Sequence, residues 1–186
     1  MVRQGKFFAT IPDFSDWLPE VYRVLKQGTH CYLMINARNL KELQTKAEAV
    51  GFKFCNLLVW IKNNATPDKF YMKRTEFILM LRKGRGHYIN DIGTSNVFTY
   101  PNVLGNKLHP TEKPVELMRD LIINSTNEGD IVLDPFMGSG STCLACKQTG
   151  REYVGIEIEQ KYYDIAVKRL NSEFVSREKS EQQHLF

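Results

Sequence analysis

Apolar residues recur along this chain at two spacings, one typical of helices that are apolar on one side and one typical of buried strands. The helical spacing covers residues 16–27, 40–50, 114–124 and 160–174, and a further helix is expected near Ser141. Strand-like runs rich in β-branched and aromatic residues cover residues 32–35, 54–61, 75–81, 131–133 and 151–159. Because helices and strands alternate, we expect an α/β fold with helices on both faces of a sheet.

The segment 129–142, with the sequence GDIVLDPFMGSGST, joins a predicted strand to a turn rich in glycine and hydroxyl groups. Asp134 follows the apolar run of the strand, and Gly138 and Gly140 allow the backbone to turn sharply and to approach a ligand before the next helix begins. A glycine turn after a strand often does no more than reverse the chain. Its combination with an acid and hydroxyl residues favours a site for a nucleotide-like ligand.

Two common nucleotide motifs do not match this turn. A dinucleotide fingerprint needs a third glycine three residues after the second, and Cys143 stands at that position. A P-loop needs a Lys-Ser or Lys-Thr pair, which does not follow Gly140. NAD and a cradled nucleotide phosphate are therefore disfavoured as ligands.

The segment from Asp134 to Thr142 resembles the cofactor motif of the DNA amino-methyltransferases, which modify adenine N6 or cytosine N4. Upstream, HPTEKP at 109–114 resembles the second cofactor motif of that family, and residues 17–35 resemble the helix and strand that follow its catalytic motif. The resemblance covers most of residues 14–172 and implies a Rossmann-like methyltransferase sheet.

The resemblance implies S-adenosyl-methionine as the cofactor. The implied cofactor-binding residues are Asp134, Pro135, Phe136, Gly138, Ser139, Gly140, Ser141, Thr142, Glu157, His109, Thr111 and Lys113. Glu157, near the end of the strand at 151–159, would bind both ribose hydroxyls, although an acid at a strand end is also compatible with a solvated charge. His109 could contact the methionine end of the cofactor, cap a loop or form a hydrogen bond in the core.

The implied reaction is transfer of a methyl group to an exocyclic amino nitrogen of a base that is flipped out of the duplex. In the family, the acceptors for the amino group belong to an Asp, Asn or Ser followed by Pro-Pro and an aromatic residue, but this sequence has no Pro-Pro pair. The motif order would place that tetrapeptide at or before Met1, and IPDF at 11–14 is a poor substitute. We therefore assign no catalytic residue and expect the sheet to be incomplete at its N-terminal side.

A missing strand would leave two halves of the sheet with open edges, which residues 6–11, KFFATI, could fill. Two functions follow. The first is a DNA N-methyltransferase of the restriction-modification kind, from a bacterium or a phage, with adenine N6 preferred over cytosine N4. The second is a non-catalytic remnant or subunit that binds cofactor or DNA and needs a completing chain, either another protein or a second copy in a homodimer.

Length and composition indicate one compact domain. The chain has 186 residues, 42% of them hydrophobic, which is enough for one core. We expect a single domain over residues 1–174, with a DNA-recognition insert at about 62–108, and a flexible tail at 175–186. Because no apolar run approaches about 18 residues and the first residues have no signal-peptide core, we expect no membrane association and a cytoplasmic location.

Positive charge is concentrated between residues 69 and 87, where Glu76 is the one acidic residue. The basic residues there are Lys69, Lys73, Arg74, Arg82, Lys83 and Arg85. Such a run is often only a solvated surface, but glycine, tyrosine and asparagine residues share this region, which favours contact with the phosphates of double-stranded DNA.

Two short motifs have weaker implications. Cys143 and Cys146 form a CxxC inside a predicted helix, and because no second pair supplies further ligands, we expect no metal site. The last residues, QQHLF, resemble the peptide with which bacterial DNA enzymes dock on the sliding clamp, through Gln182, Leu185 and Phe186. A frayed terminus is the alternative to docking.

Overall fold

The computed structural model describes residues 12–105 and 107–183, and side-chain surroundings as far as Ser172. The strand predicted at 6–11, most of the clamp-like peptide and Ile11 of IPDF lie outside the described residues. The chain forms two compact units: unit 1 comprises Met1–Leu57 and Phe77–His87, and unit 2 comprises Leu58–Glu76 and Tyr88–Phe186. The prediction of one domain over residues 1–174 stays a prediction.

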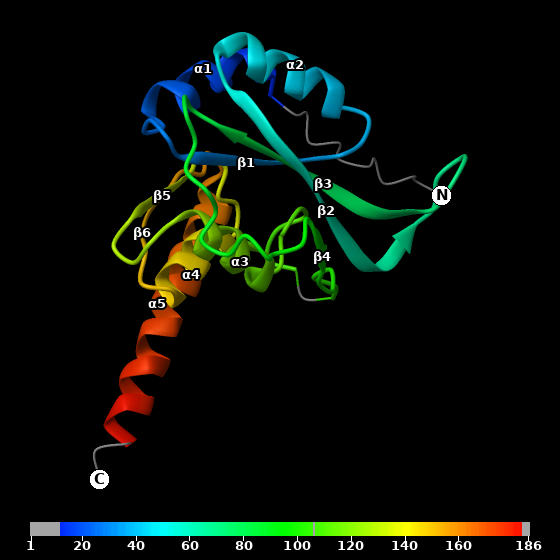
Figure 1. Cartoon of the computed structure of the whole chain (residues 1–186). Helices are drawn as coiled ribbons and strands as arrows, with labels where there is room; N and C mark the ends of the chain where they lie inside the picture. The colour runs from blue at the N-terminus through cyan, green and yellow to red at the C-terminus, as the bar shows by residue number, and fades with distance from the viewer. Residues whose placement is uncertain (1–11, 106, 184–186) are drawn as a thin grey trace. The chain divides into compact units, whose positions relative to one another are not determined.

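In unit 1, two helices, α1 (Phe14–Val24) and α2 (Leu40–Val50), pack against strand β1 (His30–Ile35) and against residues 77–82, which pair with that strand (Figure 1). The Asp13 side chain accepts a hydrogen bond from the Ser15 N–H and so caps α1. The buried core consists of Phe14, Leu18, Ile35, Leu43, Ala47, Phe52, Leu79 and Leu81. These are the apolar positions that the helical and strand spacings bring to one side of each element.

A four-stranded sheet has the order β1-β3-β2-β4. Strands β2 (Lys53–Thr66) and β3 (Lys73–Arg82) form a long hairpin, β3 pairs antiparallel with β1, and β4 (Val97–Thr99) pairs parallel with β2. Both hairpin strands are longer than the predicted 54–61 and 75–81. Asn63 lies within β2 rather than in a loop, and its side-chain oxygen accepts a hydrogen bond from the Asn102 N–H at 3.0 Å. The pairing of β2 with β3 accounts for the greater length of β2.

Unit 2 contains helix α3 (Val115–Ser125), strand β5 (Ile131–Asp134), helix α4 (Ser141–Gln148), strand β6 (Glu152–Gly155) and helix α5 (Gln160–Gln183). Strands β5 and β6 pair in parallel, as a strand–helix–strand unit requires. Helix α4 packs against both strands and against α3. Its buried Ala145 and Cys146 contact Ile122 and Val132, which fixes the turn between β5 and α4 against a packed helix layer.

Strands β5 and β6 carry an exposed apolar surface, which we call the open β5–β6 face. Its residues on the strands, with their exposed fractions, are Ile131 (62%), Leu133 (39%) and Val154 (49%), and Ile156 (53%) and Ile158 (94%) follow the end of β6. Among the described residues these two strands form a sheet of their own. Adjacent exposed apolar side chains on neighbouring strands are typical of a surface that another element covers.

Helix α5 extends past the predicted end at 174 to Gln183. The sequence 175–183 contains no glycine or proline and is rich in residues of good helix propensity, which explains the extension. The flexibility of residues 175–186 stays a prediction. No helix within the described residues is long and apolar enough to cross a membrane.

Candidate functional site

The turn between β5 and α4 is built around two glycines in a left-handed backbone conformation. Gly138 has φ +52° and Gly140 has φ +78°, a region that other residues enter only at a cost. Gly140 is also the N-cap of α4. The Asp134 carboxylate accepts a hydrogen bond from the Phe136 N–H at 3.0 Å, at the end of β5. The turn thus leads from the end of β5 to the start of α4, where residues 137–141 are buried.

Burial raises the pKa of Asp134, although a hydrogen bond from Thr142 acts against this effect. The two neighbouring strands meet at the same turn, because the Ile156 N–H donates to the Asp134 carbonyl at 2.9 Å and the Met137 N–H donates to the Ile156 carbonyl at 3.0 Å. These bonds place the end of β6 beside the glycine turn. Glu157, the next residue, is thereby brought to the site.

Glu157 contacts the turn directly. Its Oε2 accepts a hydrogen bond from the Gly138 N–H at 3.0 Å, and its Oε1 accepts one from the Glu159 N–H at 2.8 Å. A carboxylate has about four lone-pair positions, so each oxygen can still accept a hydroxyl hydrogen. The arrangement fits an acid that is oriented by the backbone and can bind a diol.

His109 lies against the same turn from the HPTEKP segment. A Cβ atom on Gly138 would lie 3.3 Å from the His109 Cγ, so only glycine leaves ordinary space there. The His109 ring also packs edge-on against Tyr162 of α5, with 4.2 Å between ring centroids. The Thr111 N–H donates to His109 Nδ1 at 3.2 Å, which in a neutral ring leaves the proton on Nε2.

Burial lowers the pKa of His109, although Glu157 and Glu112 act in the opposite direction. Its imidazole is therefore mostly neutral at pH 7. A neutral ring at this position does not repel a cationic ligand.

A buried ion pair ties the two loops to α5. Glu112, which is 7% exposed, pairs with the Arg169 guanidinium at 2.9 Å, and it also accepts a hydrogen bond from the Leu108 N–H at 2.8 Å. The same guanidinium nitrogen lies 3.3 Å from the Ser139 carbonyl and 3.4 Å from the Ser141 hydroxyl. Arg169 thus joins the HPTEKP segment to the glycine turn. Neither Arg169 nor Glu112 is among the residues that the sequence predicts.

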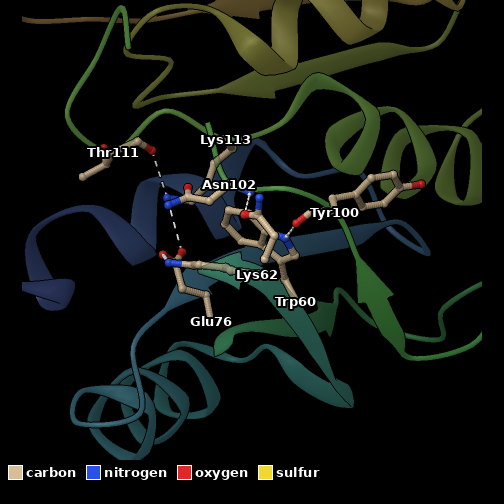
Figure 2. Close-up of polar contacts among 8 residues, drawn as sticks. Trp60, Lys62, Glu76, Tyr100, Asn102, Thr111 and Lys113 are labelled. Carbon is tan, nitrogen blue, oxygen red and sulfur yellow. Dashed lines mark hydrogen bonds and ion pairs between the residues drawn. The ribbon is translucent and has the colours of Figure 1, made fainter. Parts of the chain in front are cut away.

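Lys113 points toward Glu76 of the β2–β3 hairpin (Figure 2). Its ammonium donates to the Thr111 carbonyl at 2.9 Å and lies 3.4 Å from the Glu76 carboxylate, which also pairs with Lys62. Lys62 lies 5.0 Å from the Trp60 ring centroid, and the Trp60 indole N–H donates to the Tyr100 carbonyl at 2.9 Å (Figure 2). The structure gives Lys113 a supporting role for the loop, and a direct contact with cofactor stays a prediction.

Burial alone raises the pKa of Glu76, but Lys113 and Lys62 together bring it below the ordinary value of 4.5. A carboxyl with a lowered pKa stabilises the fold above its unfolded pKa, and this contribution is lost as the pH falls through the folded pKa. We expect Glu76→Gln to lower the free energy of unfolding by about 1 kcal/mol at pH 7, with a smaller difference below pH 4.5. Urea unfolding between pH 3 and pH 7, at intervals of about one unit, measures this.

Glu128→Gln is the matched control, because it removes the same charge from an exposed position of unit 2. We expect it to change the free energy of unfolding by less than about 0.5 kcal/mol at every pH. A Glu76→Gln effect that grows on acidification would contradict this role for the pair.

The six predicted DNA-facing residues fall in both units. Lys69, Lys73 and Arg74 lie at the end of the β2–β3 hairpin in unit 2, and the Arg74 Nε–H donates to the Lys62 carbonyl at 3.0 Å. The other three, Arg82, Lys83 and Arg85, lie in unit 1. DNA contact by these residues stays a prediction.

Two of the three basic residues in unit 1 have partners there. The Lys83 ammonium donates to the carbonyls of Tyr22 and Leu25 at 2.6 and 2.8 Å, at the C-terminal end of α1, and Arg82 donates to the Gly84 carbonyl. A cation at that end of a helix is favourable.

Both cysteines of the CxxC motif lie in the core. Cys143 and Cys146 are 1% and 0% exposed, and burial raises the pKa of each thiol to about 12. The Cys143 thiol contacts the Met137 sulfur at 3.9 Å. The described residues contain no cluster of three or more His, Cys, Asp or Glu side chains that could hold a metal ion.

Comparison with known proteins gives consistent matches over most of the chain. A family model described as DNA methylase matches residues 6–168. The type II methyltransferase M2.DpnII of Streptococcus pneumoniae is 33% identical over 177 residues, which are 84% of this chain and 66% of that protein. The putative methylase YubD of Escherichia coli K12 is 34% identical over 177 residues, covering 90% of this chain and 74% of that protein.

The chain spans about two thirds or less of three curated type II methyltransferases that it matches, with coverages of 66%, 65% and 60%. Among solved structures, that of an M1.HpyAVI–SAM complex is 34% identical, with a TM-score of 0.73 over 84% of this chain and 82% of that chain. The cytosine-N4-specific PvuII DNA methyltransferase is 16% identical, with a TM-score of 0.74 over 90% of this chain and 74% of that chain, and shows the fold alone. The predicted Rossmann-like α/β fold is confirmed.

Proposed function

The chain belongs to the DNA methylase family of N6 and N4 methyltransferases, and we propose that it transfers a methyl group from S-adenosyl-methionine to an exocyclic amino group of DNA. The observation that supports this most is the contact of three segments distant in sequence: Glu157, the glycine turn at Gly138 and the ring of His109. These are the segments that resemble the cofactor motifs of the family.

S-adenosyl-methionine fits the chemistry of these groups. The oriented Glu157 carboxylate can accept both ribose hydroxyls, and the left-handed conformations of Gly138 and Gly140 set the path of the turn beside it. The neutral His109 ring suits the methionine end, which carries the positive sulfonium. We therefore propose the predicted residues from Asp134 to Thr142, together with Glu157, His109 and Thr111, as the cofactor site.

The cofactor supplies a methyl group bound to a positively charged sulfur. Glu157, the turn at Gly138 and the His109 ring would hold this cofactor, which would give its methyl group to the amino nitrogen of the base, with S-adenosyl-homocysteine as the leaving group and the amino proton lost to solvent. This chain must exclude water and hold the base amino group beside the sulfur. The side chains that accept hydrogen bonds from the amino group are not assigned in this chain.

The direct test is transfer of isotope-labelled methyl groups to unmethylated duplex DNA, followed by nucleoside analysis. The proposal predicts labelled N6-methyladenine, and labelled N4-methylcytosine would correct only the preference for adenine. Absence of label from DNA, when the folded chain is present in excess, would contradict methyl transfer by this chain alone.

A second candidate function is that of a subunit completed by another strand, and the open β5–β6 face favours it. Exposed apolar residues such as Ile131 and Val154 on two adjacent strands offer an edge and a surface for a further strand. We propose that either another chain or a second copy of this chain covers this face. Methyl transfer whose specific rate rises with chain concentration would support a homodimer, and activity gained only with a second protein would support a separate subunit.

We also expect a cytoplasmic site of action and docking of the chain on a sliding clamp. A cytoplasmic site of action, in a bacterial or phage-infected cell, is consistent with the absence of a membrane-spanning helix from the described part of the chain. Docking on a sliding clamp through Gln182, Leu185 and Phe186 stays a prediction. Clamp binding that survives Leu185→Ala and Phe186→Ala together would contradict it.

A further inference from the structure

The turn that joins β2 to β3, residues 67–72, exposes three consecutive large apolar side chains. We call it the hairpin tip. Phe70 is 82% exposed, Tyr71 is 88% exposed and Met72 is 63% exposed. A turn between two strands is ordinarily polar, and a run of exposed apolar residues at such a place is typical of a binding surface.

Positive charges flank these side chains. The Lys69 ammonium lies 5.5 Å from the centroid of the Phe70 ring, and Lys73 begins β3 next to Met72. Lys73 pairs with Asp68, and Arg74 follows it on β3. The net positive charge and the flat rings lie within a few residues of each other. This combination fits a polyanion with stacked aromatic planes.

The base of the hairpin is held in place by the contacts already described. Lys62 of β2 pairs with Glu76 of β3, and the Arg74 side chain donates across the hairpin to the Lys62 carbonyl at 3.0 Å. These bonds join the strands within five residues of the tip, so the exposed side chains sit at the end of a two-stranded ribbon. A two-stranded β-ribbon fits the width of a DNA groove.

We propose that the hairpin tip inserts Phe70 and Tyr71 into the base stack of duplex DNA, with Lys69, Lys73 and Arg74 on adjacent phosphates. This inference rests on the proposed function, because the substrate there is duplex DNA. Inserted side chains unstack a base step, which lowers the cost of flipping a base next to it. The tip would thus assist extrusion of the target base as well as binding.

The first test measures the affinity of the full chain for a fluorescent duplex oligonucleotide at several salt concentrations. Replacing Phe70 and Tyr71 together by alanine is expected to weaken binding about tenfold, with little change in the dependence on salt. Lys69→Ala and Lys73→Ala are expected each to reduce the slope of log affinity against log salt by about 0.9. The two kinds of residue are thereby separated by two different readouts.

Two variants serve as controls. Ile92→Ala removes a side chain that is 80% exposed elsewhere in unit 2, and it is expected to change the affinity by less than about twofold. Tyr71→Phe keeps the ring and is expected to bind like the unaltered chain. Since all these side chains are exposed, none of the substitutions removes a core contact.

The second test is direct. Tryptophan emission of the Phe70→Trp variant is expected to be quenched by duplex DNA, because stacking on a base quenches an indole, whereas emission of Ile92→Trp is expected to be unchanged. Quenching of Phe70→Trp relative to this control would support the proposal. Equal emission changes at both positions would overturn it.

Other outcomes separate this inference from the proposed function. The tip assignment is overturned if the unaltered chain binds duplex DNA and the tip variants bind equally well, if that chain binds no duplex, or if the tip binds anionic lipid vesicles in preference to DNA. Duplex binding that depends on the tip, in a chain that neither binds S-adenosyl-methionine nor transfers methyl groups, would support the tip assignment and contradict the proposed function.

Discussion

Replacing Glu157 by alanine is expected to weaken the binding of S-adenosyl-methionine about 100-fold. Two hydrogen bonds from the ribose to a charged group are lost, and the Gly138 N–H, which donates to Glu157 at 3.0 Å, loses its acceptor. The second loss acts on the turn itself, because Gly138 lies against His109 and its left-handed backbone depends on the surrounding contacts. Isothermal titration of cofactor into the unaltered and altered chains measures the difference.

Glu159→Ala is the matched control. It also removes one negative charge, and Glu159 is exposed and lies two residues after Glu157. Its backbone N–H, which donates to Glu157, is unchanged by the substitution. We expect it to reduce cofactor affinity by less than about threefold. Equal effects of Glu157→Ala and Glu159→Ala would show that only the general negative charge matters and would contradict the ribose role.

Replacing Arg169 by alanine is expected to lower the free energy of unfolding by about 3 kcal/mol. Glu112 has a side chain that is only 4% exposed, so loss of its partner leaves a carboxylate buried with fewer donors. Because the same guanidinium lies near the Ser139 carbonyl and the Ser141 hydroxyl, the change should also weaken cofactor binding at the glycine turn. Urea unfolding gives the stability, and a cofactor titration gives the affinity.

Lys168→Ala removes a neighbouring exposed cation from the same helix and is expected to cost less than about 0.5 kcal/mol. A double replacement, Glu112→Gln with Arg169→Ala, should cost less than the sum of the single replacements, because the buried charge is gone. Additive losses in the double variant would rule out a coupled pair.

The spacing of apolar residues predicts a helix or strand well where residues at its own ends, such as glycine or proline, determine where it starts and stops. The helix predicted at 40–50 is α2, because Gly51 ends it with φ +120°, and α3 begins at Val115, one residue after the predicted start at Pro114. The spacing does not predict the extent of a strand where pairing with residues distant in sequence determines it. Strand β2 continues through Asn63 because it pairs with β3, and the three-residue strand β4 exists only by pairing with β2.

In the candidate site too, some residues can be predicted from the sequence and others cannot. The motif resemblance correctly brings together Gly138, His109 and Glu157, since each lies at a strand end or in a loop of recognisable sequence. Arg169 escapes such reasoning, because its partner Glu112 is 57 residues away and nothing in a helix pattern marks one of several basic residues as buried. Lys113 is in the recognised motif, but its partner Glu76 on β3 could be found only from the fold.

The open β5–β6 face has a clear consequence for the activity of this chain. The residues proposed as the cofactor site all belong to unit 2, so we expect cofactor binding without the element that would cover Ile131 and Ile156. Methyl transfer has the additional need for acceptors of the base amino group, which this sequence does not offer as a Pro-Pro motif. If the chain binds S-adenosyl-methionine by itself but transfers methyl groups only after a completing chain is added, the subunit function is supported over autonomous methyl transfer.

The most direct measurement is equilibrium dialysis of the unaltered, folded chain against labelled S-adenosyl-methionine. We expect saturable binding at one site per chain, competed by S-adenosyl-homocysteine and strongly reduced in Glu157→Ala. Absence of saturable binding by the folded chain, or binding that Glu157→Ala leaves unchanged, would contradict the assignment of the turn at Gly138 and Glu157 as the cofactor site.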